Sequence, residues 1–147
     1  TYCIDNKVPK FLIYIMQNTG YIEGWGLYCE NFVEKDDLLN RYGKLNYEMM
    51  RSIRLVIDTG IHYYGWGYQK AYNYFRRYSS LTDKEVRNEV IRYISTPGQA
   101  LAYKIGEIFI LKLRKKYLQN GGDIKEFHSK VIKYGPLPLD IFKTIFE

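Results

Sequence analysis

The stretch IRYISTPGQALAYKIG, residues 91–106, separates two helical segments at a Pro97-Gly98 break. Proline removes a helix hydrogen-bond donor, and glycine adopts backbone conformations that other residues avoid. The pair therefore predicts that one helix ends before this break and that another begins directly after it. The start of the second helix exposes unpaired backbone N–H groups and the positive end of the helix dipole. Because an arginine, two tyrosines and a lysine lie in the same stretch, we expect this end to meet an anion or a developing oxyanion.

Helical patterns continue on both sides of this stretch, and the sequence contains no period-two alternation long enough for a strand. We therefore expect an all-α fold, in which residues 1–147 form a single packed multi-helix domain. The expected helices cover approximately residues 9–17, 19–33, 36–57, 68–78, 82–94, 98–119, 123–133 and 139–146.

Local signals at several helix ends support this assignment. We expect Thr19 to cap the second helix and Asp123 to cap the seventh, while Thr82 and Glu85 form a capping box. Gly60 is expected to follow the end of the third helix in the left-handed conformation. The buried stripe of that third helix is expected to consist of Leu38, Leu45, Met49, Ile53, Val56 and Ile57.

The composition argues against several classes of protein. The chain has 147 residues, of which 46% are hydrophobic, enough for one core, and a formal net charge of +6. No apolar run reaches the roughly 18 residues that span a membrane, and no signal peptide is visible. The two cysteines lack C-x-x-C spacing, and Cys29 is expected to be a buried free thiol. We therefore expect a cytoplasmic protein without membrane contact, and nucleic-acid binding ranks last among the hypotheses because no motif for it is visible.

Four blocks of sequence, in a fixed order, carry a resemblance to one family. They are IEGWGLYCE at residues 22–30, RLVIDTGIHYYGW at residues 54–66, the stretch at residues 91–106, and FHSKVIKYGPLPLDIF at residues 127–142. Together they resemble the family catalogued as domain of unknown function 885, whose members look like zinc peptidases of the gluzincin type. The resemblance implies peptide-bond hydrolysis by a zinc-activated water, on an all-α scaffold similar to the C-terminal part of such a peptidase.

The resemblance implies that Glu23 is a metal ligand. In gluzincins, two histidines of an H-E-x-x-H helix bind zinc, and a carboxylate from a later helix supplies the third protein ligand. Glu23, the first residue of the EGW motif, matches that carboxylate. Without this motif around it, a surface glutamate in the first turn of a helix would be the preferred interpretation.

The resemblance also implies residues that would stabilise the oxyanion of the reaction. Tyr103 is the preferred hydrogen-bond donor and Tyr93 is its rival, because negative charge develops on that oxygen. His62, which follows the Asp-Thr-Gly motif, is a third catalytic candidate, with a structural role as the equally weighted alternative.

Three further residues are expected to contact the substrate. Arg92 would bind a substrate carboxylate through its planar guanidinium, and Gln99 and Lys104 would contact the substrate backbone or its carboxylate. An ion pair inside the fold explains Arg92 equally well, and a solvated or paired charge is the preferred alternative for Lys104.

The chain lacks part of the expected metal site. Its two histidines, His62 and His128, are far apart, and neither belongs to an H-E-x-x-H motif. In the family this motif lies N-terminal to the EGW block, so we expect it before Thr1 and expect this chain to be the C-terminal portion of a larger protein. One carboxylate does not hold zinc, because a catalytic site needs three protein ligands. The isolated chain is therefore expected to be inactive and to bind zinc only when the missing segment is supplied.

The expected partners follow from the same resemblance. A peptide would be the substrate of the completed enzyme. A homo-oligomer or a partner chain is expected to cover an apolar face on the helix that bears Glu23. The alternative function is that of a non-catalytic binding or structural protein that kept the helical scaffold.

Overall fold

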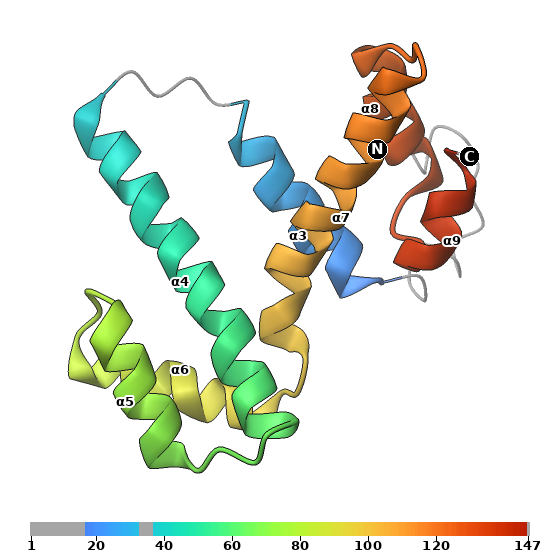
Figure 1. Ribbon diagram of the computed structural model, residues 1–147. Helices are drawn as coiled ribbons and strands as arrows, with labels where there is room; N and C mark the ends of the chain where they lie inside the picture. The colour runs from blue at the N-terminus through green and yellow to red at the C-terminus, as the bar shows by residue number, and fades with distance from the viewer. Residues whose placement is uncertain (1–16, 33–36, 147) are drawn as a thin grey trace. The chain divides into compact units, whose positions relative to one another are not determined.

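A computed structural model of the chain describes residues 17–32 and 37–146 (Figure 1). In these ranges the chain forms seven α-helices and no strand, which confirms the expected all-α class. The helices are α3 (Thr19–Glu30), α4 (Leu38–His62), α5 (Tyr68–Tyr78), α6 (Asp83–Ser95), α7 (Gln99–Gln119), α8 (Ile124–Tyr134) and α9 (Leu139–Thr144). Over the same residues, no helix combines the length and the apolar character needed to cross a membrane.

The helices group into two compact units. Among the described residues, the terminal unit comprises residues 17–30 and 105–146, and the central unit comprises residues 31–32 and 37–104. Helix α7 begins in the central unit and continues in the terminal unit. Each unit buries a hydrophobic core of its own.

The core of the terminal unit is built largely from aromatic rings. Tyr21 and Tyr28 of α3 pack with Phe127 of α8 and with Phe142 and Phe146, and each of these five residues is at most 8% exposed. The rings of Tyr21 and Phe142 meet edge to face, with centroids 5.4 Å apart. Such pairs add to the free energy of burial because the ring edges carry positive and the faces negative partial charge.

Two glycines allow α3 and α7 to touch through their backbones. A Cβ atom built on Gly24 would lie 2.4 Å from the backbone of Gly106, and one built on Gly106 would lie 1.9 Å from the carbonyl oxygen of Gly20. No side chain fits at either distance. Glycine at these positions therefore fixes how closely the helix that bears Glu23 packs against α7.

In the central unit, α4 packs against α5 and α6. The rings of Phe75 and Tyr93 stack at the centre of this core, with centroids 6.1 Å apart. The buried members of the core are Ile53, Ile57, Ala71, Phe75, Val86, Val90, Tyr93 and Ala100. The expected capping box of Thr82 and Glu85 is present and starts α6, the helix that carries Tyr93.

The expected cap of α3 is wrong. Asn18 rather than Thr19 precedes the helix, and its side-chain oxygen accepts a hydrogen bond from the backbone N–H of Tyr21 at 2.9 Å. Asparagine is as good a cap as threonine or better, because its side chain reaches an unpaired N–H of the first turn. The helix therefore includes Thr19.

The expected end of α4 is also wrong. The helix does not stop near Ile57 but continues to His62, so Gly60 lies inside it. The left-handed conformation occurs later, at Gly65, whose φ is 64°. A Cβ atom on Gly60 would lie 2.5 Å from the indole of Trp66, so a glycine is needed there for the close approach of that ring.

Four of the six residues of the expected buried stripe of α4 are exposed. Ile53 and Ile57 are buried. The other four, Leu38, Leu45, Met49 and Val56, are between 39% and 78% exposed. The helical spacing therefore grouped residues from two different faces of α4. Only the face with Ile53 and Ile57 packs against α5 and α6.

The other helix bounds agree with the expected ones to within about three residues: α3 ends at Glu30 and α9 ends at Thr144. Asp123 caps α8 by accepting hydrogen bonds from the N–H groups of Lys125 and Glu126, and α5 has the expected bounds. Cys29 is a free thiol, but it is half-buried rather than buried. The helix expected at residues 9–17 lies almost wholly outside the described residues.

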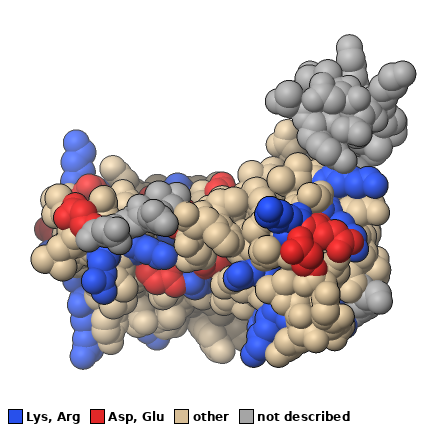
Figure 2. Space-filling model, turned by 90° about the horizontal axis from the view of Figure 1, so that it is seen from above, with Lys and Arg blue, Asp and Glu red and all other residues tan. Residues whose placement is uncertain are grey.

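Basic side chains lie beside acidic ones over much of the surface. On the face shown in Figure 2, lysine and arginine atoms neighbour aspartate and glutamate atoms in several places. Within single units, Arg76 pairs with Asp83 at 2.9 Å and Lys130 with Glu126 at 3.1 Å. Part of the positive charge is therefore neutralised locally.

Candidate functional site

The Pro97-Gly98 break is fixed by a buried carboxylate from α4. Asp58 is 2% exposed, and both of its carboxylate oxygens lie 3.2 Å from the backbone nitrogen of Gly98. Burial raises the pKa of Asp58, although the bond from Gly98 and the nearby His62 act in the opposite direction. An anion thus does meet the N-terminal end of α7, and it is supplied by the chain itself. This contact positions the start of α7, which begins at Gln99 and carries Tyr103 one turn later.

A network of polar side chains, which we call the polar cluster, joins α4, α6 and α7 within the central unit. Its members are Arg54, Glu89, Arg92, Tyr93, Gln99 and Tyr103. Four of them were singled out from the sequence, and Arg54 and Glu89 were not. The cluster carries two guanidinium groups and one carboxylate, which leaves it with a net positive charge.

Glu89 is the centre of the polar cluster. Its carboxylate accepts hydrogen bonds from Arg92 Nη2 at 2.9 Å and Nε at 3.2 Å, and from the Tyr93 hydroxyl at 2.5 Å. Arg54 Nη2 lies 3.5 Å away. Burial raises the pKa of Glu89, but the bonds from Arg92 and Tyr93 and the charges of both arginines outweigh burial and lower it below the usual value. Glu89 is therefore ionised at neutral pH and holds both arginines in place.

Tyr93 is buried, and its hydroxyl group is fully engaged. It donates to Glu89 and accepts from Arg54 Nε at 3.1 Å. Burial, followed by the bond to Glu89, raises the pKa of Tyr93 far above its ordinary value. Since its proton is committed to Glu89, Tyr93 is less suited to donate to a substrate than the sequence suggested.

Tyr103 differs from Tyr93 in having a proton to offer. Arg92 Nη1 donates to the Gln99 side-chain oxygen at 2.5 Å, and Gln99 Nε2 lies 3.5 Å from the Tyr103 hydroxyl, the outer limit of a hydrogen bond. The guanidinium of Arg54 lies 5.0 Å from the centroid of the Tyr103 ring, within the range of a cation–π contact. Within the part of the chain that the structure describes, no group accepts the Tyr103 hydroxyl proton.

The catalytic candidate His62 and the predicted substrate residues Lys104 and Arg92 have partners within the fold. Nε2 of His62 lies 2.8 Å from the carbonyl oxygen of Tyr93, and because a carbonyl only accepts, Nε2 carries the proton. His62 thereby binds the C-terminal turn of α6, where a cation or donor is favourable. Lys104 pairs with Glu48 of α4. The guanidinium group of Arg92 pairs with Glu89. This is the ion pair inside the fold that was the alternative to a substrate-binding role.

Glu23 lies in the terminal unit, half-buried on α3. No hydrogen bond or ion pair joins its carboxylate to any residue that the structure describes. Those residues also contain no group of three or more His, Cys, Asp or Glu side chains that could bind a metal ion. A catalytic zinc site needs three protein ligands, so the described residues alone do not form one around Glu23.

A second pair of polar groups lies in the terminal unit. The hydroxyl of Tyr28 and Nε2 of His128 are 2.7 Å apart, and Trp25 stacks against Tyr28. Burial, followed by the charge of Arg114, lowers the pKa of His128. The aromatic neighbours make a structural role the simplest account of this histidine.

Of the two cluster members that the sequence analysis missed, Glu89 could have been predicted from the sequence and Arg54 could not. Glu89, Arg92 and Tyr93 are three and four positions apart on one helix, so their contact follows from helix geometry. Arg54 is the first residue of the RLVIDTGIHYYGW block, but nothing in its neighbourhood indicates a partner 39 residues later.

Comparison with known proteins identifies the family. A family model described as "Bacterial protein of unknown function (DUF885)" matches residues 5–145. A crystal structure described as that of "the putative lipoprotein from Colwellia psychrerythraea" is similar, with 34% sequence identity and a TM-score of 0.79. The match covers 87% of this chain and 23% of that one, so this chain spans less than a quarter of that protein's length. No curated protein matches. The chain belongs to the DUF885 family of bacterial proteins.

Proposed function

We propose that this chain is the C-terminal, substrate-binding portion of a gluzincin-like zinc peptidase. Tyr103 donates a hydrogen bond to the oxyanion that forms on the scissile carbonyl, and Glu23 is one protein ligand of the metal. The observation that carries the proposal is the Tyr103 hydroxyl, whose proton is unused within the described residues while its ring is fixed by Arg54.

The surroundings of Tyr103 suit a donor to a developing negative charge. Such a donor is most effective when it is oriented before the reaction and needs no rearrangement. The chain of contacts from Glu89 through Arg92 to Gln99 orients the hydroxyl, and the net positive charge of the cluster favours an anion beside it. Arg92 acts in this proposal by holding Gln99, which leaves Gln99 as the group that contacts the substrate backbone.

The metal would supply the nucleophile. A bound zinc ion acidifies a coordinated water, which can then attack a carbonyl at neutral pH. Glu23 would contribute one carboxylate ligand, and the family resemblance assigns the other protein ligands to an H-E-x-x-H segment outside residues 1–147. The role of Glu23 is argued from the terminal unit alone, and the role of Tyr103 from the central unit alone.

The experiment that tests the proposal compares Tyr103→Phe with Tyr64→Phe in the native gene product that contains this chain. Peptide hydrolysis is measured as kcat and KM on a peptide library. Tyr103→Phe should lower kcat by about 10²–10³-fold with little change in KM, as expected for the loss of one oxyanion donor. Tyr64 is 68% exposed and lies outside the polar cluster, so its variant should retain full activity. Equal activity of the two variants, at unchanged melting temperature, would rule out the role of Tyr103.

A non-catalytic binding protein is the second candidate function. It is favoured by the exposed apolar residues of α4, which indicate a surface that another helix covers. Absence of hydrolysis from the native product, together with an intact fold, would support this candidate instead.

A further inference from the structure

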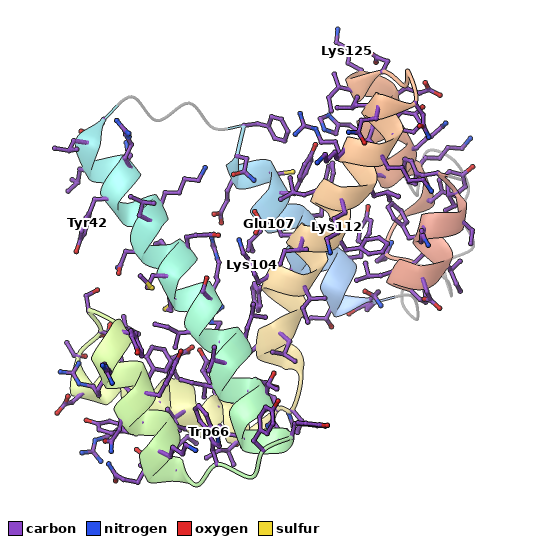
Figure 3. The ribbon with its side chains drawn as sticks, viewed as in Figure 1. Tyr42, Trp66, Lys104, Glu107, Lys112 and Lys125 are labelled. Carbon is purple, nitrogen blue, oxygen red and sulfur yellow. The ribbon has the colours of Figure 1, made fainter. Side chains whose placement is uncertain are left out.

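An exposed apolar stripe runs along α4, separate from the polar cluster. Its members, which we call the α4 seam, are Leu38, Tyr42, Leu45, Met49 and Val56, exposed by 78%, 62%, 69%, 52% and 39%. Figure 3 shows the side chain of Tyr42 pointing away from the helix. Scattered exposed apolar residues are ordinary, but a continuous row of them on one helix marks an interaction surface.

The spacing of the α4 seam is that of a helix-packing surface. Its residues follow one another after four, three, four and seven positions, so they fall on the a and d positions of a heptad repeat. This 3.5-residue period aligns one face of a helix with a second helix that crosses at a shallow angle. The seam is distinct from the stripe of Met50, Ile53 and Ile57, which packs inside the central unit.

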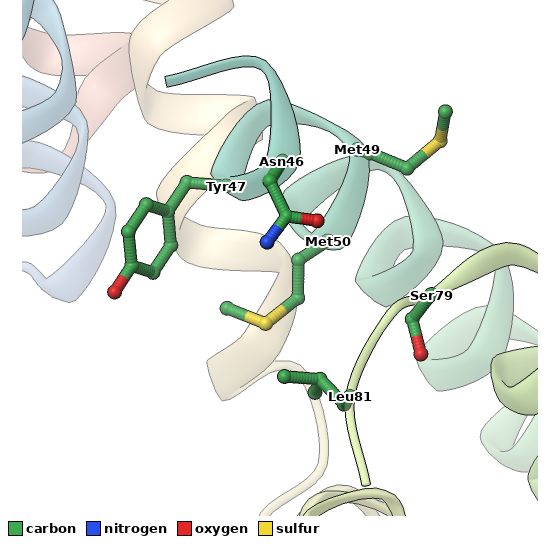
Figure 4. Close-up of a pocket in the computed structure, with 6 residues that line it drawn as sticks. All are labelled: Asn46, Tyr47, Met49, Met50, Ser79 and Leu81. Carbon is green, nitrogen blue, oxygen red and sulfur yellow. The ribbon is translucent and has the colours of Figure 1, made fainter. Parts of the chain in front are cut away.

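A pocket lies beside the α4 seam. It has a volume of about 120 Å³ and is lined by Asn46, Tyr47, Met49, Met50, Ser79 and Leu81 (Figure 4). A cavity of about 150 Å³ accepts benzene, so this pocket suits one apolar side chain of a partner. The hydroxyl of Ser79, one of the lining residues, is buried without a hydrogen-bond partner among the described residues.

The charge beside the α4 seam indicates the kind of partner. In the heptad numbering of the seam, Arg41 and Glu48 occupy the flanking g positions, and Glu48 pairs with Lys104. Lys44 and Arg51 occupy c positions, away from the seam. An Asp or Glu beside the apolar stripe of a partner helix would complement Arg41, and such flanking charges set partner choice in helix pairs.

The source of this helix follows from the length of the similar structure. This chain covers 23% of that protein, so most of the related polypeptide lies outside the matched region. We infer that the α4 seam is the docking surface for an amphipathic, acid-flanked helix from the part of the DUF885 fold outside residues 1–147. The inference does not depend on peptidase activity.

The test places the photo-crosslinking residue p-benzoylphenylalanine at position 42 of the native gene product, and mass spectrometry identifies the linked peptide. The expected peptide comes from outside residues 1–147 and has apolar residues at spacings of three and four beside Asp or Glu. The matched control carries the crosslinker at position 64. Tyr64 is 68% exposed in the same unit but lies off the seam, so this variant should not yield that peptide.

A substitution in the seam provides the second arm. Leu45→Glu should abolish the crosslink from position 42, whereas Leu45→Met, which keeps the apolar volume, should preserve it. Both variants should fold, because Leu45 is 69% exposed. A crosslink within residues 1–147 would overturn the inference, and isotope-labelled mixtures would show whether it joins one chain or two copies. Absence of any crosslink, or its persistence in Leu45→Glu, would overturn it as well.

Discussion

Tyr93 and Tyr103 lie ten positions apart in one stretch, and their surroundings give them different capacities. Tyr93 is buried and gives its proton to Glu89. Tyr103 is half-buried, and its ring lies against Arg54. At the scale of single residues, burial and the bond to Glu89 make Tyr93 a residue that positions its neighbours. Tyr103 lacks both features and keeps a hydroxyl proton that it can donate.

Removing the Tyr93 hydroxyl tests this positioning role. Tyr93→Phe leaves the stacking on Phe75 in place but takes one hydrogen-bond partner from Arg54 and one from Glu89, both largely buried. We expect the free energy of unfolding in urea to fall by about 1–3 kcal/mol, the cost of unpaired buried polar groups. Tyr64→Phe, at an exposed position, should change it little. Equal stability of both variants would show that the cluster does not depend on Tyr93.

His128 should make stability depend on pH. Its pKa in the folded protein is lowered, mainly by burial, so the unfolded chain binds the proton more tightly. The stability that this histidine contributes is therefore complete above its ordinary pKa of about 6.5 and is lost as the pH falls toward the lowered value. Chemical denaturation between pH 7.5 and 5 should show a shallower loss for His128→Gln than for the unchanged chain. Identical slopes would contradict the pKa assignment.

The sequence predicted the candidate residues that lie close together along the chain. Arg92, Gln99 and Tyr103 follow one another around a single break, and helix geometry brings the last two together at a spacing of four. Arg54 and Asp58 contact residues 39 and 40 positions away. No local pattern encodes such contacts, because they depend on how α4 packs against α6 and α7.

At the scale of helices, the contact between α3 and α7 depends on the absence of side chains. Gly24 and Gly26 are two positions apart on α3, yet only Gly24 faces the backbone of Gly106. A Cβ atom on Gly26 would meet no atom within 4 Å. Substitutions at these two positions therefore form a matched pair. Their difference measures how much the close contact of α3 and α7 contributes to the free energy of unfolding.

The matched pair predicts opposite effects of one substitution. Gly24→Ala should lower the free energy of unfolding by about 3 kcal/mol, because the methyl group would force the helices apart. Gly26→Ala should raise it by up to about 1 kcal/mol, because alanine is the better helix former. Thermal unfolding of both variants measures the difference. Similar melting temperatures would mean that α3 and α7 do not touch at Gly24.

Helix α4 shows why pattern alone misassigned one element in an otherwise well-predicted fold. Its apolar residues obey helical spacing throughout, but they belong to a buried stripe and to the exposed α4 seam. The sequence predicts a helix stop at Gly60 because glycine often follows a helix end. Glycine is needed at this position because the indole of Trp66 packs directly against its Cα. The sequence does not reveal this contact.

At the scale of the whole molecule, the two proposed roles fall in different units. Glu23 belongs to the terminal unit, and Tyr103 with the polar cluster belongs to the central unit. The family match spans both units, over residues 5–145, while the similar solved structure is about four times longer than the matched region. In the proposed enzyme, this chain would therefore supply only part of the site, and the remaining metal ligands would come from outside residues 1–147.

The most direct test of this account is the zinc content of the native gene product that contains residues 1–147, measured after dialysis by elemental analysis. The account predicts one zinc ion per chain, lost in Glu23→Gln and retained in Glu126→Gln, which removes an exposed carboxylate on α8. It also predicts that residues 1–147 alone retain no stoichiometric zinc, because one carboxylate cannot hold the ion. A native product without zinc, zinc retained by Glu23→Gln, or stoichiometric zinc on residues 1–147 alone would contradict it.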